Sequence, residues 1–328
     1  MPNQPSDVRS GRQRLILGVS VVVLSAMALV GCSSAAASST SSKALSVGIV
    51  TFSTSDVDTN KMVTAMTTQA KSKGWSVQNL NANGDQQQAV TDIKQLVTKN
   101  VSAIIVTVFD STALAAGLAA AKAANIPVLS AGGGAAPGIA FSTDDGAGQP
   151  VVDLMLKNLN NSGTVLNLTY HPGVPCRQRA DSFASIVKKY PKVKVTNHEI
   201  TIPGAAETSQ AATSAWLAAN THTTGNFAIF NCYDDNALGA VAALQQNGRT
   251  GVQVYSYNAT PSALQAVRAG TMTATLWLDL ASAGKILVDS IPKIRSAGTS
   301  WKPQSVIPNY IIVTKSNIDS FIAAHGAG

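Results

Sequence analysis

The sequence contains few cysteines, histidines and aromatic residues, and each shortage excludes a class of protein. Only three of the 328 residues are cysteines, so the chain is not a small domain built from disulfides. The four histidines are dispersed without the spacing of metal ligands, and we expect no metal site. Aromatic residues make up 5% of the chain and are not interleaved with a basic stripe, which argues against nucleic acid as a partner.

Charged residues are also few, at 12%, whereas 45% of the residues are hydrophobic. That apolar fraction is ample for a core and excludes global disorder. The glycines at 132–134 are not followed by Gly-Lys-Ser or Gly-Lys-Thr, so they do not form a phosphate-binding P-loop, and we expect no cofactor. The length suits two domains or one large domain.

The N-terminus has the pattern of an export signal. Residues 1–14 are polar and contain three arginines, and residues 15–30 form an apolar run shorter than the roughly 20 residues of a membrane span. The next cysteine lies in Leu-Val-Gly-Cys, which looks like a bacterial lipobox ending at Cys32. We predict a lipoprotein signal peptide over 1–31 and lipidation of Cys32. The alternative is a membrane anchor helix with an incidental cysteine.

Residues 32–43 are rich in serine and alanine and have no apolar periodicity. This composition predicts a flexible tether between the lipid and a globular body. The expected location is the outer face of the cytoplasmic membrane, with the lipid as the only contact between protein and membrane.

The body alternates β-branched runs with amphipathic stretches, which predicts βαβ units and parallel sheets. The pattern breaks near Pro137 and then restarts, so we predict an α/β fold with two doubly wound parallel-sheet lobes. The expected strands are 45–52, 76–82, 102–109, 128–131, 164–168, 193–200, 226–231 and 252–257. The expected helices are 61–73, 86–99, 111–124, 146–160, 177–190, 207–220 and 236–247.

Four segments, in order, resemble the type I periplasmic binding proteins, the ribose- and galactose-binding group that serves ABC importers. The resemblance covers about residues 45–315. The segments are ALAAGLAAAKAANIPVLSAG (113–132), CRQRADSF (176–183), CYDDNALGAVAALQQNG (232–248) and YSYNATPSALQAVRAGTMTATL (255–276).

The resemblance implies two lobes joined by a three-strand hinge that closes onto a ligand. We expect one lobe over 44–142 plus 279–307 and the other over 143–278 plus 308–328. The implied protein is a monomer and not an enzyme. It captures a small polar solute, a sugar or polyol, and delivers it to an ABC permease. The alternative within the same fold is a sensory protein that binds an autoinducer-like signal and acts through a receptor.

The resemblance also implies ligand-binding residues. Arg177 stands at the family's ligand arginine, whose planar guanidinium can hold two hydroxyls, while Arg179 is expected to make structural pairs. Asn258 stands where sugar-binding members carry aspartate, and Tyr233 where they carry asparagine. We expect both to contact the ligand.

Departures from the family pattern point to the kind of ligand. The loop after the first strand lacks the usual stacking aromatics and instead carries Asp56 and Asp58. The usual Asp-Arg pair after the fourth strand is replaced by two glycines. A ring stacked on both faces is therefore disfavoured, and a polyol, a linear or modified sugar, or a cationic solute is favoured. Further candidate contacts are Phe109, Tyr170, Trp277 and Asp279.

Cys176 and Cys232 follow strands that are neighbours in the family's strand order. That placement, in an exported protein, implies a disulfide that would preorganise the site. The rival interpretation is a cysteine-dependent enzyme in which Cys176 is a free nucleophile and His171 its base, but no oxyanion-binding or orienting signature accompanies it.

Overall fold

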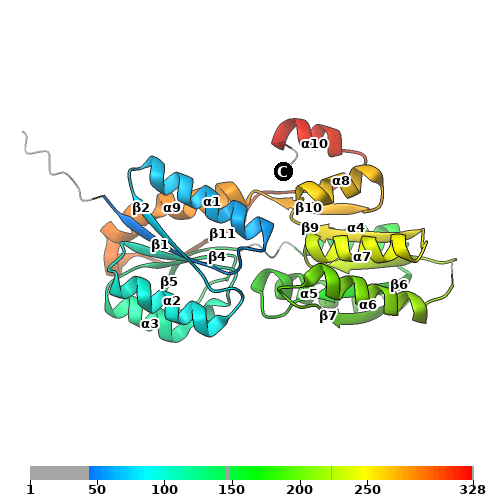
Figure 1. Cartoon of the computed structure of the whole chain (residues 1–328), viewed down its shortest axis with the longest axis horizontal. Coiled ribbons are helices and arrows are strands. Elements are labelled where there is room, and N and C mark those ends of the chain that lie inside the picture. The colour runs from blue at the N-terminus through cyan, green and yellow to red at the C-terminus, as the bar shows by residue number, and fades with distance from the viewer. Residues whose placement is uncertain (1–43, 145, 147, 223, 327–328) are drawn as a thin grey trace, which may run out of the picture. The chain divides into compact units, whose positions relative to one another are not determined.

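The computed structural model describes residues 44–144, 146, 148–222 and 224–326, and these fold into two α/β lobes (Figure 1). The predicted signal peptide, the predicted tether and Cys32 lie outside the described residues. Within the described part of the chain, every helix is too short or too polar to cross a membrane. The predicted fold class, two doubly wound α/β lobes, is confirmed.

The first lobe consists of a parallel sheet and its covering helices. Its strands are β1 (Ser46–Thr51), β2 (Ser76–Asn81), β3 (Ala103–Thr107), β4 (Val128–Ala131), β5 (Ile139–Thr143) and β11 (Gln304–Val306). Its helices are α1 (Val57–Ser72), α2 (Gln86–Thr98), α3 (Ala115–Ala123) and α9 (Leu280–Ala297), with 3₁₀ turns η1 (Ser111–Leu114) and η2 (Gly298–Ser300). The sheet order is β11-β5-β4-β3-β1-β2, with all neighbours parallel. Helices α1 and α9 cover one face, and α2 and α3 cover the other (Figure 1).

The second lobe repeats this plan. Its strands are β6 (Gly163–Thr169), β7 (Val193–Glu199), β8 (Phe227–Asn231), β9 (Val252–Tyr257), β10 (Ala274–Leu278) and β12 (Tyr310–Thr314). Its helices are α4 (Gln149–Asn158), α5 (Val174–Val187), α6 (Ala205–Ala219), α7 (Asp234–Gln246), α8 (Pro261–Ala269) and α10 (Ile318–His325). The sheet order is β12-β10-β9-β8-β6-β7, and only the β10–β12 pair is antiparallel within the described residues.

Parallel strands covered on both faces explain the apolar character of the sheets. On β1, Ile49 packs with Met66 of α1, whereas the adjacent Val50 packs on the opposite side with Ile93 of α2. All four side chains are buried. The alternation of strand side chains between two faces therefore places both helix layers against one sheet.

Side-chain caps explain where several helices begin. The side chains of Asp56, Asp85, Asp110, Thr260 and Asp279 each accept a hydrogen bond from a backbone N–H in the first turn of the following helix. Such caps satisfy backbone donors that have no partner inside the helix. The cap at Asp110 stands directly before the helix expected over 111–124.

Several predicted boundaries are wrong by a few residues, and two of these errors affect the site. The helix expected from residue 61 begins at Val57, directly after its cap, so the predicted loop carrying Asp58 is the first turn of α1. The helix expected from residue 177 begins at Val174, because Pro175 occupies the first turn, where no backbone N–H is needed. The strand β5 was not among the predicted strands.

Candidate ligand-binding site

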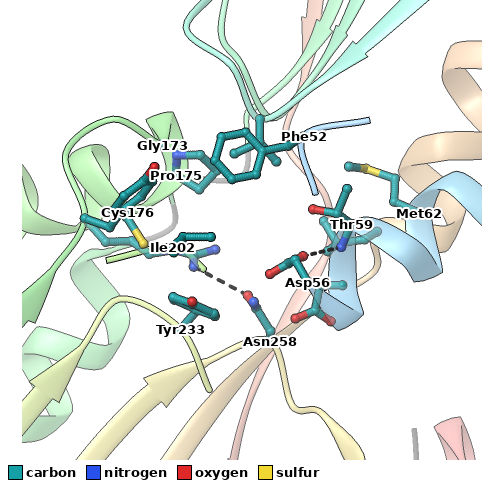
Figure 2. Close-up of a pocket in the computed structure, with 15 residues that line it drawn as sticks. Phe52, Asp56, Thr59, Met62, Gly173, Pro175, Cys176, Ile202, Tyr233 and Asn258 are labelled. Carbon is teal, nitrogen blue, oxygen red and sulfur yellow. Dashed lines mark hydrogen bonds between the residues drawn. The ribbon is translucent and has the colours of Figure 1, made fainter. Parts of the chain in front are cut away.

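A cavity lies between the two lobes, beyond the carboxyl ends of the strands (Figure 2). Its volume is about 70 Å³, which is room for several water-sized groups because one water needs roughly 10–15 Å³. The first lobe contributes Phe52, Asp56, Asp58, Thr59, Met62, Val108 and Leu280. The second lobe contributes Tyr170, Gly173, Pro175, Cys176, Arg179, Ile202, Tyr233 and Asn258.

The start of α1 carries the two carboxylates of the first-lobe wall. Asp56 caps the helix by accepting from the backbone N–H of Thr59 at 2.5 Å (Figure 2). The cap places the carboxylate at the positive end of the helix dipole, where a negative charge is favourable. Asp58, two residues on, is 6% exposed and also lines the cavity.

Burial raises the pKa of Asp58 well above its ordinary value, and the nearby charges of Asp56 and Asp234 raise it further. Lys61 and a hydrogen bond with Asn258 act in the opposite direction. A carboxyl group held in this way is available both as a proton donor and as an acceptor. It can therefore bind a hydroxyl in either hydrogen-bonding role.

Arg179 of α5 supplies the cation of the second-lobe wall. It is 3% exposed, and its guanidinium donates to the backbone oxygen of Cys232 at 2.6 Å and to Asn258 Oδ1 at 3.4 Å. The same group lies 4.4 Å from the centre of the Tyr257 ring, a cation–π contact. These contacts orient the guanidinium at the edge of the cavity.

A disulfide joins Cys176 to Cys232, as the sequence analysis expected. It connects the first turn of α5 to the loop between β8 and α7, and β8 pairs directly with β6, which precedes α5. Because both sulfur atoms form this bond, Cys176 is not a free thiol. His171, the base of the rival enzyme hypothesis, instead has its Nδ1 at hydrogen-bond distance, 2.7 Å, from Glu199 Oε2.

Tyr233 and Asn258 lie on one side of the cavity, and Phe52 and Pro175 lie on the other (Figure 2). Asn258 has a φ of 107°, in the left-handed region that few side-chain-bearing residues adopt. Its backbone N–H donates to Leu276 O at 2.6 Å, which anchors the residue to β10. Outliers of this kind are held by surrounding structure and cluster at ligand sites.

Burial raises the pKa of the Tyr233 hydroxyl, and the charges of Asp235 and Asp56 raise it further. The hydroxyl is therefore neutral and can donate a hydrogen bond. Burial and Asp56 also raise the pKa of Asp235 to about 6. Asp235 and Asp56 both line a second cavity that adjoins the first at Tyr233 and Ile202.

The structure brings together five of the nine predicted ligand contacts, namely Asp56, Asp58, Tyr170, Tyr233 and Asn258. The other four lie outside the cavity lining. Phe109 packs behind the cavity against Phe52, with ring centroids 4.8 Å apart. Trp277 and Asp279 line a neighbouring cavity, where the Trp277 ring contacts the His325 ring at a tilt, with centroids 4.5 Å apart, and Asp279 caps α9. Arg177 points to Asp110 instead of the cavity.

Arg177 was predicted to bind the ligand and Arg179 to make structural pairs, whereas in the structure Arg179 lines the cavity and Arg177 pairs with Asp110. Residues two apart on a helix point to different sides, so only one of Arg177 and Arg179 can face the cavity. The position directly after a strand end is a second feature of the sequence that indicates cavity residues. Phe52, Val108 and Tyr170 directly follow β1, β3 and β6, and all three line the cavity. Among these, only Tyr170 was a predicted contact.

No group of three or more His, Cys, Asp or Glu side chains in the described part of the chain is arranged to hold a metal ion. The cavity wall combines carboxyl, amide, guanidinium and phenol groups with an apolar face. Such a wall can bind hydroxyl groups through hydrogen bonds and carbon chains through contact with Phe52.

Comparison with known proteins gives three findings. A sequence model of the periplasmic binding protein domain matches residues 47–295. A xylitol-binding protein of Mycolicibacterium smegmatis is 27% identical over 263 residues, which are 77% of this chain and 73% of that protein. An ABC transporter solute-binding protein from Agrobacterium vitis, solved with bound allitol, has the same fold, with a TM-score of 0.79 and 22% identity over 85% of this chain and 98% of that one.

Proposed function

The chain belongs to the periplasmic binding protein domain family, and we propose from this premise that it is the solute-binding protein of an ABC importer and not an enzyme. The solute is a small sugar or polyol that binds between the lobes. The observation that carries this proposal is the inter-lobe cavity, which is lined by Asp58 of one lobe and by Arg179 and Asn258 of the other.

The proposed chemistry follows from the two walls. Hydroxyl groups both donate and accept hydrogen bonds, so they suit a site that offers the carboxyls of Asp56 and Asp58, the amide of Asn258 and the guanidinium of Arg179. Phe52 covers the carbon chain. Each contact of a buried charged group with a hydroxyl contributes more than a neutral hydrogen bond, because the cavity is shielded from water.

An acyclic polyol is the first class to test. The cavity volume, about 70 Å³, favours a small solute. The related xylitol-binding protein and the structural neighbour with bound allitol suggest linear polyols as probes. The Asp56 carboxylate at the cavity wall suggests a second probe class, an amino-substituted polyol, whose cationic group it can pair with.

We also propose that residues 1–31 are a lipoprotein signal peptide, that Cys32 carries the lipid and that residues 32–43 tether the lobes to the outer face of the cytoplasmic membrane. The closed pair of lobes would deliver the solute to a permease. Uptake of radiolabelled solute by cells lacking this protein tests delivery: we expect uptake to be lost. Unchanged uptake with an impaired growth or signalling response would favour the sensory alternative.

The binding proposal is tested by thermal unfolding of the purified full-length chain with a panel of polyols, sugars and amino polyols. A solute present at 100 times its dissociation constant stabilises the protein by about 2.7 kcal/mol, which is several degrees in unfolding temperature. We expect at least one polyol or sugar to give this shift. A panel without any shift would overturn the proposal.

Matched variants show whether the shift comes from the cavity. Asp58→Asn and Arg179→Lys alter opposite walls, and we expect either to abolish the shift. Arg268→Ala removes an arginine of the same lobe that pairs with Asp319 on the outer surface. We expect that control to keep the full shift.

A further inference from the structure

Two short segments from opposite lobes meet beside the cavity. Residues 108–110 follow β3 in the first lobe, and residues 171–177 run from the loop after β6 into the first turn of α5 in the second. Arg177 Nη2 donates to Asp110 Oδ2 at 2.6 Å, and the backbone N–H of Val174 donates to Val108 O at 3.4 Å. Phe109 and Gly173 form an isolated antiparallel bridge. All three contacts join protein to protein and involve no solute.

Both members of the ion pair are held in place by their own lobes. Asp110 accepts from the backbone N–H and the hydroxyl of Thr112, at 2.9 and 2.7 Å. Arg177 makes a second hydrogen bond, to His171 O at 3.1 Å. Burial alone would raise the pKa of Asp110, but the Thr112 hydrogen bonds and the Arg177 charge hold it below its ordinary value. The carboxylate is therefore ionised at neutral pH.

The backbone of residues 108–110 is held in an uncommon conformation. Val108 has a φ of 64°, which a β-branched residue rarely adopts, and the backbone N–H of Phe109 donates to Thr107 O at 2.7 Å across this tight turn. Strained backbone of this kind persists only where the surrounding structure holds it, and it clusters at functional sites.

The loop after β4 leaves space for the turn at residues 108–110. A Cβ atom on Gly133 would lie 2.1 Å from Phe109 O, so only glycine allows the two segments to approach so closely. The sequence analysis interpreted the glycine pair after β4 as the loss of two ligand residues. The structure gives Gly133 a different role, which is to make room for the segment that reaches the other lobe.

We propose that residues 108–110 and 171–177 form a latch, with the Arg177–Asp110 ion pair at its centre, that favours the closed arrangement of the lobes independently of solute. Arg177 and Asp110 are positioning residues, because neither lines the cavity. Val108 and Gly173 do line it, so the latch also covers one side of the bound solute. The proposal rests on the proposed function in one respect only: the lobes must separate to admit a solute.

The test measures the distance between the lobes directly. Nitroxide labels are placed on the full-length chain by Ala116→Cys in α3 and Ala184→Cys in α5, two exposed positions on different lobes. The native Cys176–Cys232 pair is bonded and does not react with the label, and Cys32, which would react, is replaced by serine in every labelled variant. Double electron–electron resonance then gives the populations of short and long distances, without solute and with xylitol.

We expect a short-distance population without solute in the wild-type protein. Arg177→Ala should reduce the ratio of closed to open protein roughly fivefold, the effect of losing a part-buried ion pair worth about 1 kcal/mol. Asp110→Asn keeps the oxygen that accepts from Thr112 and removes the charge, so it should act in the same direction. The double variant should be no more open than Arg177→Ala, because both changes remove one interaction.

The control is Arg268→Ala, which breaks an ion pair of the same length, 2.6 Å, inside the second lobe. Its distance distribution should match that of the wild type. The proposal is overturned if the wild-type protein shows only long distances without solute, or if Arg177→Ala leaves the distribution unchanged. If xylitol changes none of the distance distributions, xylitol is not a solute of this protein. The latch is then still tested by comparing the wild type with the variants in the absence of solute.

Discussion

The two walls of the cavity are built differently. The second-lobe wall is cross-linked by the Cys176–Cys232 disulfide. Arg179 binds the backbone of the same loop and packs on Tyr257. Behind this wall, the buried carboxylate of Asp234 accepts from the backbone N–H of Thr260 at 2.7 Å and from the hydroxyl of Thr275 at 2.9 Å. Three loops are thereby joined into one unit.

The first-lobe wall is held by hydrogen bonds between residues that are close in the sequence. Asp56 caps α1, Asn60 donates to Thr54 O at 2.6 Å, and the hydroxyls of Ser53 and Ser55 lie 2.7 Å apart. No disulfide joins the first lobe within the described residues. The comparison suggests a division of roles: the second lobe presents a preformed surface, and the first lobe brings two carboxylates to it when the lobes close. The predictions below test this division.

The largest expected effect comes from removing the cross-link. In Cys176→Ser/Cys232→Ser, we expect the free energy of unfolding to fall by about 4 kcal/mol, because the bond closes a loop of 56 residues. Chemical denaturation under non-reducing conditions measures this. Solute affinity, measured on the folded variant, should also fall. A variant that keeps wild-type affinity would show that the second wall needs no cross-link.

The two arginines of α5 give the next effect. Arg179→Ala leaves the Cys232 carbonyl without its donor inside a buried wall, and we expect a loss of about 3 kcal/mol in unfolding free energy. Arg177→Ala, whose side chain is 33% exposed, should cost about 1 kcal/mol or less. Urea unfolding curves measure both losses of unfolding free energy. Equal losses for the two variants would contradict the placement of Arg179 in the buried cavity wall and of Arg177 outside it.

The buried carboxyl behind the second wall predicts a pH dependence. Burial raises the pKa of Asp234 from 3.8 in the unfolded chain to about 6. Because the folded state holds this proton more tightly, its stabilising contribution is complete below pH 3.8 and is lost as the pH rises through 6. We expect Asp234 to lower the free energy of unfolding by about 2 kcal/mol between pH 4 and pH 7.

Chemical denaturation at several pH values gives the free energy of unfolding as a function of pH. The slope of this curve should be smaller for Asp234→Asn than for the wild type. The control is Asp289→Asn in the first lobe. Although burial opposes it, hydrogen bonds with Lys73 and Gln69 lower the pKa of Asp289, so its contribution is present above pH 3.8 and is lost only at lower pH. That variant should keep the wild-type slope between pH 4 and pH 7.

The smallest effect concerns the cap of the first wall. Asp56→Ala removes the acceptor for Thr59 and should cost about 1 kcal/mol of stability. Asp56→Asn keeps an acceptor oxygen and should be close to the wild type in thermal unfolding. If both variants lose solute affinity while only the alanine variant loses stability, the carboxylate charge of Asp56 acts on the solute separately from its role as a cap.

Most of the fold could be predicted from the sequence, because buried parallel strands such as β1 and β3 are continuous β-branched runs. The strands at the sheet edges carry weaker signals. The strand β11 has only three residues, and β5 follows a loop rich in glycine. Pairing with a distant strand, which no local pattern encodes, makes these segments strands.

The site was predictable in part, because a ligand at the carboxyl ends of the strands follows from the topology. Asn258 was found from the family resemblance, and Asp58 from a departure from the family pattern. The orientation of α5 was not: in the structure Arg179 lines the cavity and Arg177 pairs with Asp110. Which side of a helix faces a cavity depends on tertiary packing, and a motif alone does not determine it.

The most direct test of the account is a calorimetric titration of xylitol, allitol and D-ribose into the full-length chain and into two first-lobe variants. Asp58→Ala changes the cavity wall, and Asp289→Ala changes a carboxylate on the outer surface of α9. We predict that the wild type and Asp289→Ala bind at least one of these solutes with equal affinity, and that Asp58→Ala binds it at least about tenfold more weakly. Binding that is unaffected by Asp58→Ala, or no binding of any of the three solutes, would contradict a sugar or polyol site between the lobes.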